Sequence, residues 1–144
     1  MLPRPARPVS FAGLMTLYES NFIRLGWLLP QLPEPGASLV STATHDMPLH
    51  LGVEEVARYT TTLKLTYFFR VGGDFIPDPD LKIRVYHDAG LVEAMACIHK
   101  HRHEALVPYS TGSGTELQRR WTRNMMLNKW LEYCADKGHL FAHG

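Results

Sequence analysis

Residues 81–89 read LKIRVYHDA, and this segment divides its side chains between two faces. Apolar and polar side chains alternate with a period of two, which is typical of a half-buried β-strand. One face carries Leu81, Ile83 and Val85, and the other carries Lys82, Arg84 and Tyr86. After a break at Asp88-Ala89-Gly90 the alternation resumes through residues 92–98. The stretch therefore predicts a β-hairpin at the centre of the fold.

The register of this hairpin follows from requiring apolar residues to face each other, since a slip of one residue turns a whole face over. A two-residue loop at residues 89–90, with its glycine at a positive φ, places Val85 opposite Ala94. A three-residue loop would place Val85 opposite Glu93 and would bury a carboxylate. The sequence therefore predicts the two-residue loop, with Tyr86 facing Glu93 on the outer side of the sheet.

Two amphipathic helices are predicted at the ends of the chain. The first begins at an N-cap, Ser10, and continues with helical apolar spacing up to Pro30. The second runs to about residue 137, where Gly138 is a natural stop. Two capping boxes are possible at its start, Thr115 with Gln118 or Ser113 with Glu116.

Three further strands are predicted before the hairpin, over residues 39–44, 49–53 and 58–70. The third is rich in β-branched and aromatic residues, which favour strands. Residues 72–80 contain two glycines and two prolines and are predicted to form a loop. Short connections favour an antiparallel meander. The fold class predicted is α+β: a two-layer domain over residues 10–144, with an antiparallel sheet of about five strands and the N-terminal and C-terminal helices packed on it.

Composition sets limits on the function. The chain has 144 residues, enough for one core, and a formal net charge of +1, which argues against a protein dominated by polyanion binding. Residues 1–9 are Pro/Arg-rich and predict a disordered lead-in without the apolar segment of a signal peptide. No apolar run approaches the ~20 residues of a membrane span. With only two cysteines there is no disulfide framework, so we expect a soluble cytoplasmic protein.

Several pieces spread along the chain resemble a small proteobacterial family of unknown function, the YqiB-like proteins. The matching pieces are residues 18–22 (YESNF), 28–30 (LLP), 58–61 (RYTT), 86–89 (YHDA) and 130–134 (WLEYC). The resemblance implies a cytoplasmic bacterial protein. Because the family carries no established activity, the resemblance implies no catalytic residues and no cofactor.

The dipeptide His-Asp occurs twice, at residues 45–46 and 87–88. In HD-type phosphohydrolases such a pair supplies metal ligands from a helix, whereas both pairs here lie at predicted turns. Aspartate is common in turns because its side chain accepts a backbone N–H. A small metal-dependent phosphohydrolase that uses His87 and Asp88 is therefore kept as an alternative function.

Three histidines, His99, His101 and His103, follow Cys97 at every second position. Imidazole and thiolate groups are ligands for zinc or copper. Successive same-face residues of a strand nevertheless lie ~6.6 Å apart, so they converge on one ion only if the strand bends. We predict no built metal site or cofactor, and these histidines are the metal candidates that remain.

Other catalytic patterns are absent from the sequence. There is no GxSxG elbow, no assembled Ser/His/Asp order and no P-loop. A non-enzymatic function is therefore favoured.

The predicted outer face of the sheet is the main candidate for a binding surface. Its basic side chains are Arg58, Lys64, Lys82 and Arg84, accompanied by Tyr86, with His87 and Asp88 at the end of the strand and Glu93 as the main acid. Such a face is often simply solvated. Its functional interpretation is a non-catalytic binding or regulatory module for an acidic protein or another small anionic ligand. A protein is favoured over nucleic acid because the net charge is small.

Two further features leave alternatives open. Arg119 and Arg123 lie on the apolar side of the last helix, where they either overhang the sheet edge and close one end of a pocket or lie in solvent. The outer face is also an alternative homodimer interface, with Phe68 and Tyr86 as anchors.

Overall fold

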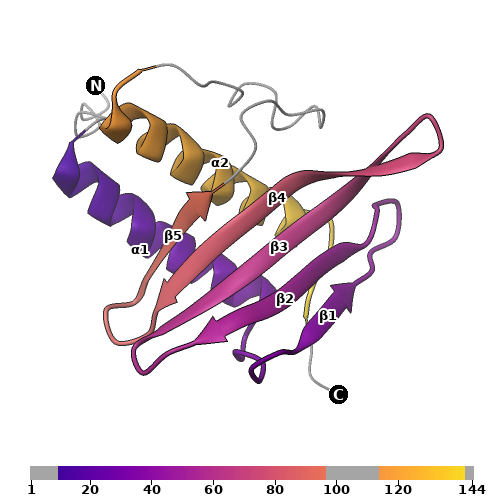
Figure 1. Cartoon of the computed structure of the whole chain (residues 1–144), viewed down its shortest axis with the longest axis horizontal. Helices are drawn as coiled ribbons and strands as arrows, with labels where there is room; N and C mark the ends of the chain where they lie inside the picture. Colours follow the sequence, from indigo (N-terminus) through magenta and orange to yellow (C-terminus); the bar gives the residue numbers. More distant parts are fainter. Residues whose placement is uncertain (1–9, 97–113, 142–144) are drawn as a thin grey trace.

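The computed structural model describes residues 10–96 and 114–141, and it shows a helix, five strands and a second helix in that order (Figure 1). The elements are α1 (Phe11–Leu28), β1 (Ser38–Ser41), β2 (Leu49–Val56), β3 (Thr60–Val71), β4 (Asp74–Tyr86), β5 (Leu91–Ala96) and α2 (Glu116–Asp136). No helix among these residues is long and apolar enough to cross a membrane.

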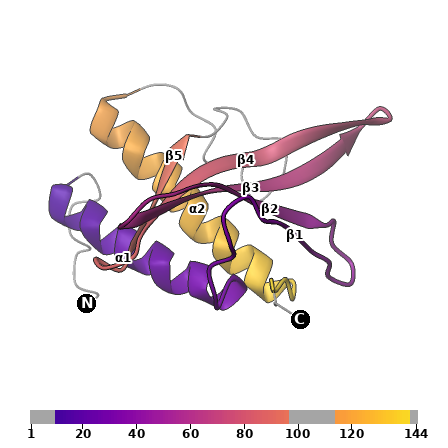
Figure 2. The same cartoon turned by 60° about the horizontal axis from the view of Figure 1, so that its bottom comes forward.

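The strands form one antiparallel sheet in the order β1-β2-β3-β4-β5, which is a simple meander. Figure 2 shows α1 and α2 side by side on the same face of this sheet. The predicted two-layer α+β architecture is therefore confirmed, and the second face of the sheet carries no described helix.

The core lies between the sheet and the two helices. Leu65 and Ile83 from the central strands are fully buried, as are Leu127 and Trp130 from α2. The predicted inner face of residues 81–85 is confirmed, because all three of its apolar side chains are buried. Cys134 also lies in this core, where burial raises the pKa of its thiol.

The predicted two-residue loop of the central hairpin is wrong. Tyr86 pairs with Leu91, so residues 87–90 form a four-residue turn, closed by the Gly90 N–H donating to the Tyr86 carbonyl at 3.0 Å. Val85 lies opposite Val92 instead of Ala94. From Val85 to Ile83 the register differs from the prediction by two residues, which leaves Val92 and Ala94 on the predicted inner face; the register shifts again between Ile83 and Lys82. Pairing apolar with apolar residues does not separate two registers that differ in this way.

The predicted loop at residues 72–80 is also wrong in most of its length. The tight turn is confined to Gly72-Gly73, both at positive φ, and β4 begins at Asp74. Between the pairs Thr66–Asp80 and Phe68–Pro77, two residues of β4 lie opposite one residue of β3, and this β-bulge in β4 accommodates its proline-containing part. The first strand, in contrast, is shorter than predicted and ends at Ser41.

The predicted helix ends are confirmed. The Ser10 side chain accepts a hydrogen bond from the Gly13 N–H at 3.0 Å at the start of α1. Thr115 and Gln118 form the complete capping box of α2, and Gly138 follows its C-cap at φ 93°. The alternative box at Ser113 begins outside the described residues.

Candidate functional site

The outer sheet face brings three predicted basic residues together. Lys64 of β3 lies directly opposite Lys82 of β4, and Arg84 follows on the same face two residues further along β4. The two lysine side chains are 49% and 48% exposed. We call Lys64, Lys82 and Arg84 the outer cationic cluster.

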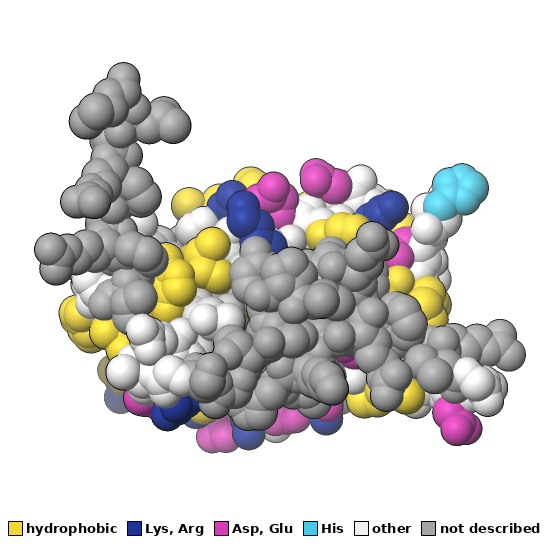
Figure 3. Space-filling model, turned by 90° about the horizontal axis from the view of Figure 1, so that it is seen from above, with side chains coloured by type: hydrophobic (Ala, Val, Ile, Leu, Met, Phe, Trp, Pro, Cys, Tyr) yellow, Lys and Arg dark blue, Asp and Glu magenta, His cyan; other side chains and the backbone are white. Residues whose placement is uncertain are grey.

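Carboxylates surround this cluster. Lys64 Nζ lies 3.6 Å from Asp80 Oδ1, and Lys82 Nζ lies 3.7 Å from Glu54 Oε2. Exposed ion pairs of this length contribute about 0–1 kcal/mol each. Neither acid belongs to the predicted outer face, and Asp80 lies within the predicted loop of residues 72–80. In Figure 3, too, the Lys and Arg side chains in view lie beside Asp and Glu side chains.

Arg58 lies in the turn between β2 and β3, ahead of the strand in which it was predicted. Its guanidinium carbon lies 5.3 Å from the centre of the Tyr59 ring, a cation–π contact. Arg58 is therefore held in the turn and is not on a strand that contributes to the outer cationic cluster.

His87 and Asp88 both lie in the four-residue turn after β4. The His87 Nε2 atom is 2.7 Å from the Thr61 hydroxyl, and the His87 backbone N–H donates to the Tyr59 carbonyl. The imidazole therefore helps to anchor the turn to β3. The Asp88 side chain is exposed.

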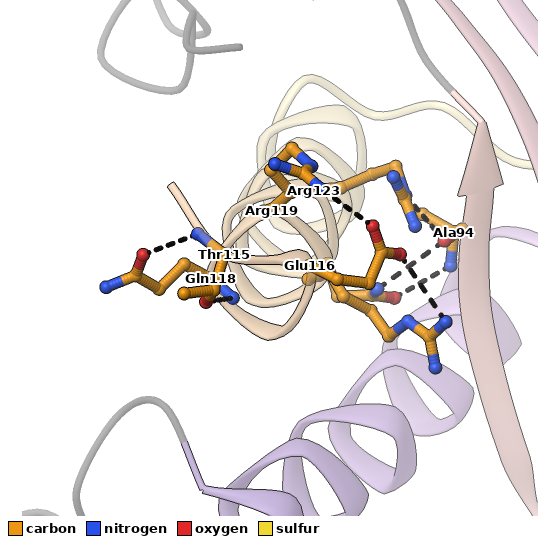
Figure 4. Close-up of polar contacts among 8 residues, drawn as sticks. Ala94, Thr115, Glu116, Gln118, Arg119 and Arg123 are labelled. Carbon is orange, nitrogen blue, oxygen red and sulfur yellow. Dashed lines mark hydrogen bonds and ion pairs between the residues drawn. The ribbon is translucent and has the colours of Figure 1, made fainter. Parts of the chain in front are cut away.

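The two arginines predicted as candidates in α2, Arg119 and Arg123, have different partners, as Figure 4 shows. Arg123 reaches over the edge of the sheet and donates from Nε to the Ala94 carbonyl of β5 at 3.0 Å. Arg119 instead pairs with Glu116 at 3.1 Å and bonds the Gly114 carbonyl at the start of its own helix. Only Arg123 of this pair contacts the sheet.

A second polar group belongs to the free edge of β5. The Asn124 side chain accepts from the Ala94 N–H at 2.7 Å, and the Asn21 side chain donates to the Val92 carbonyl at 3.2 Å. Asn128 donates to the Asn21 side chain at 3.1 Å and links the two helices. These buried amides replace the backbone partner that a sixth strand would supply. The only sign of these contacts in the sequence is an asparagine at an apolar position of a helix.

A buried Ser/His/Asp contact was missed at the sequence level. His139 Nδ1 lies 3.0 Å from the Ser41 hydroxyl, and His139 Nε2 lies 2.8 Å from Asp46 Oδ2. Tyr67 donates to the other Asp46 oxygen at 2.7 Å. The His139 and Asp46 side chains are 0% and 4% exposed, so a substrate has no access and the contact ties the C-terminal segment to the start of the sheet. Nothing in the local sequence links these distant residues.

Metal binding gains no support in the described part of the chain. No three His, Cys, Asp or Glu side chains there gather closely enough to hold an ion. The two His-Asp dipeptides make separate contacts, Asp46 with His139 and His87 with Thr61. The candidates His99, His101 and His103 lie outside the described residues.

The fold and the site define a small two-layer α+β protein with one helix-covered sheet face and a charged second face. The chain belongs to the family described as protein of unknown function (DUF1249), whose model matches residues 24–140. The predicted resemblance to the YqiB-like proteins is thereby confirmed.

The uncharacterized protein YqiB of Escherichia coli K12 is 29% identical to this chain over 128 residues, covering 89% of this chain and 90% of that protein. The proteins of the same name in the O6:H1 and O157:H7 strains match to the same extent. No solved structure matches the chain.

Proposed function

We propose that this protein is a non-catalytic binding module that holds an acidic protein segment on the outer face of its sheet. One observation carries the proposal: Lys64 and Lys82 face each other directly across β3 and β4. Like charges in this position destabilise a sheet. A pair of side chains that lowers stability without an evident structural benefit is typical of a functional site.

The neighbouring carboxylates leave the outer cationic cluster available. Glu54 and Asp80 lie more than 3.5 Å from the lysine nitrogens, and both lysine side chains remain half exposed. A partner's carboxylates can therefore compete with them. Because a carboxylate of the partner would replace Glu54 or Asp80 in an existing ion pair, we expect a modest affinity that falls as the salt concentration rises.

An apolar pocket on the same face favours a protein partner over a small anion. It has a volume of about 350 Å³ and is lined by Met47, Pro48, His50, Phe68 and Phe75. The His50 and Phe68 rings meet edge to face at 5.1 Å. Phe68 lies four residues along β3 from Lys64, which is about 13 Å. An extended peptide with an apolar side chain about four residues from an acidic cluster would reach both features.

The test is binding of poly-L-glutamate to the purified protein at low and high salt. We expect the Lys64→Gln/Lys82→Gln variant to bind about threefold to tenfold more weakly, since each exposed ionic contact is worth about 0.2–1 kcal/mol. The matched control is Lys129→Gln/Lys137→Gln, which removes the same charge from exposed positions at α2. Equal weakening in both variants would show a net-charge effect and would contradict the proposal.

The two alternatives lead to different outcomes. A phosphohydrolase that uses His87 and Asp88 would release phosphate from phosphoesters in the presence of a divalent ion and would lose this activity in His87→Ala. A homodimer anchored by Phe68 and Tyr86 would sediment as a dimer and would dissociate in Phe68→Ser.

A further inference from the structure

The side of α1 that points away from the sheet is apolar, although it lies in solvent. Phe22, Ile23 and Trp27 are 38%, 57% and 50% exposed, and Leu32, in the connector after α1, is 43% exposed. Glu19 is the one charged residue among the exposed positions of this helix, all of which the structure describes. A helix that is apolar on both sides is usually buried on both. The two-layer fold therefore leaves one apolar side of α1 uncovered.

The second helix shows that this is not a general property of the helix layer. The exposed residues of α2 are all polar: Glu116, Gln118, Arg120, Lys129 and Asp136. Both helices lie side by side on the same face of the sheet (Figure 2). Contiguous exposed apolar side chains mark an interaction surface. We call this surface the α1 apolar face and define it by Phe22, Ile23, Gly26, Trp27 and Leu32.

A hollow lies within the α1 apolar face. Gly26 lines a pocket of about 300 Å³ together with Phe22, Leu29, Pro30 and Leu32. A methyl group added at Gly26 would have no neighbouring atom within 4 Å. Glycine inside a helix lowers stability relative to alanine. No contact among the described residues requires a glycine here, whereas a close approach from a second molecule would.

The charges around this face favour a protein surface over a membrane. Helices that bind membranes carry lysine and arginine beside their apolar side. The one basic residue of α1, Arg24, already bonds Glu132 at 3.3 Å and the Ser20 hydroxyl at 2.6 Å. Glu19 would in addition be repelled by anionic lipids. A face with so little charge can pack against its own copy without strong repulsion.

We propose that two copies of this chain form a symmetric dimer in which the α1 helices pack antiparallel through their apolar faces, about a two-fold axis near Arg24. This axis places Phe22 of each copy opposite Gly26 of the other, so each ring covers the other's hollow. The two Glu19 side chains then lie about 15 Å apart along the helices, whereas a parallel pair would place them side by side. Each Arg24 keeps Glu132 of its own chain as its partner.

The area of this face fits a reversible dimer. A fully buried aromatic side chain covers about 150–250 Å², so the half-exposed Phe22, Ile23, Trp27 and Leu32 offer roughly 350 Å² per copy. Neighbouring residues bring the total for two copies to about 1,000 Å², the lower end for specific interfaces. We therefore expect a dissociation constant in the micromolar range. The proposal does not depend on the proposed function, because α1 and the outer cationic cluster lie on opposite sides of the sheet (Figure 2).

Analytical ultracentrifugation of the full chain, from micromolar to millimolar concentration, tests the proposal. We expect a reversible equilibrium between monomer and dimer. Ile23 lies next to the proposed axis, so the two Ile23 side chains are neighbours. Ile23→Lys and Ile23→Glu are each expected to dimerise at least about tenfold more weakly than the wild type, because each brings like charges together. An equimolar mixture of these two variants is expected to form a heterodimer, a recovery that requires two copies arranged about this axis.

Gly26→Leu separates folding from association. The new side chain enters open space in the monomer and favours the helix, so we expect unfolding at a higher urea concentration. It occupies the place of the other copy's Phe22 ring, so we expect dimerisation to weaken at least about tenfold. Val40→Lys adds the same charge as Ile23→Lys at a 54% exposed residue of β1 and is the matched control, which we expect to dimerise as the wild type.

Four results would overturn the proposal. The first is a wild-type chain that stays monomeric at every concentration, including one that binds phosphatidylcholine vesicles through α1 instead. The second is a dimer that Phe68→Ser dissociates and Ile23→Lys does not, which would place the interface on the outer sheet face. The third is a folded Gly26→Leu protein that dimerises as the wild type. The fourth is the absence of a heterodimer when the two Ile23 variants are mixed.

Discussion

At the scale of single residues, the Asp46 carboxylate is a buried charge with a partner on each oxygen. It accepts from Tyr67 on one oxygen and contacts His139 on the other, and its side chain is almost fully buried. Burial of such a group is tolerated only when both oxygens have partners. The contact therefore determines how the segment after α2 docks on β1.

Replacing Asp46 with asparagine is expected to destabilise the protein by about 2–4 kcal/mol, because His139 and Tyr67 would lose a charged acceptor inside the core. Urea unfolding measures the loss, and Asp88→Asn in the exposed turn after β4 serves as the control. Equal free energies of unfolding for the two variants would show that the buried contact does not stabilise the fold.

Two buried tyrosines predict how stability changes at alkaline pH. The pKa of Tyr18 is raised to about 12, chiefly by burial and then by Glu93, and burial with the Asp46 hydrogen bond also raises the pKa of Tyr67. The unfolded chain loses these protons near pH 10 while the folded chain keeps them. The associated stability is therefore complete below pH 10 and falls above it by about 1.4 kcal/mol per pH unit for each tyrosine, and the Tyr18 contribution is lost by about pH 12.

Urea unfolding between pH 9 and pH 11.5 measures how steeply the free energy of unfolding falls with pH. We expect a smaller slope in Tyr18→Phe and no change in Tyr59→Phe, because Tyr59 is 56% exposed. A slope that is the same in all three proteins would contradict the assignment.

At the scale of elements, β5 is an edge strand whose backbone is satisfied by side chains of the helices. Asn124 contacts both the N–H and the carbonyl of Ala94, and Asn21 contacts the Val92 carbonyl. Open edges pair with other chains unless they are covered. The buried asparagines therefore hold the helix layer in register with the sheet and cover its edge.

We expect Asn124→Leu to cost about 2–4 kcal/mol, because it leaves the buried Ala94 N–H without an acceptor and removes one acceptor of the buried Asn21 amide. Hydrogen exchange at the Ala94 amide should become faster, and the variant should aggregate more readily. Lys129→Leu introduces the same side chain on the exposed side of α2 and is the control. Undiminished protection of the Ala94 amide would refute the role of Asn124.

For the strands, some features could be predicted from the sequence and others could not. Alternation over residues 81–86 predicted which side chains are buried, because burial depends on the face alone. It did not determine the turn, since Val85 finds an apolar partner in either Ala94 or Val92. The prolines of residues 72–80 favour a loop, whereas a bulge in β4 itself lets most of these residues pair with β3.

Contacts between segments that are distant in the chain could not be predicted from the sequence. The group of Ser41, Asp46 and His139 forms only when the C-terminal segment closes on β1, and no local pattern encodes that closure. Likewise, the acids beside Lys64 and Lys82 follow from strand register. The basic residues of the outer face were predictable by alternation, but their neutralising partners were not.

At the scale of the whole molecule, the sheet has two chemically different faces. One is covered by both helices and holds the core (Figure 2). The other presents the outer cationic cluster and an apolar pocket further along the same strands. The covered face supplies the stability of the fold, and the uncovered face is the one that we propose binds a partner.

We propose that the outer face binds an acidic partner, and amide chemical-shift mapping with poly-L-glutamate is the sharpest test of this binding. We expect the shifts to concentrate on residues 62–66 and 80–84 and to extend toward Phe68. Shifts located on α1 and α2 instead, or no shifts at low salt, would contradict it.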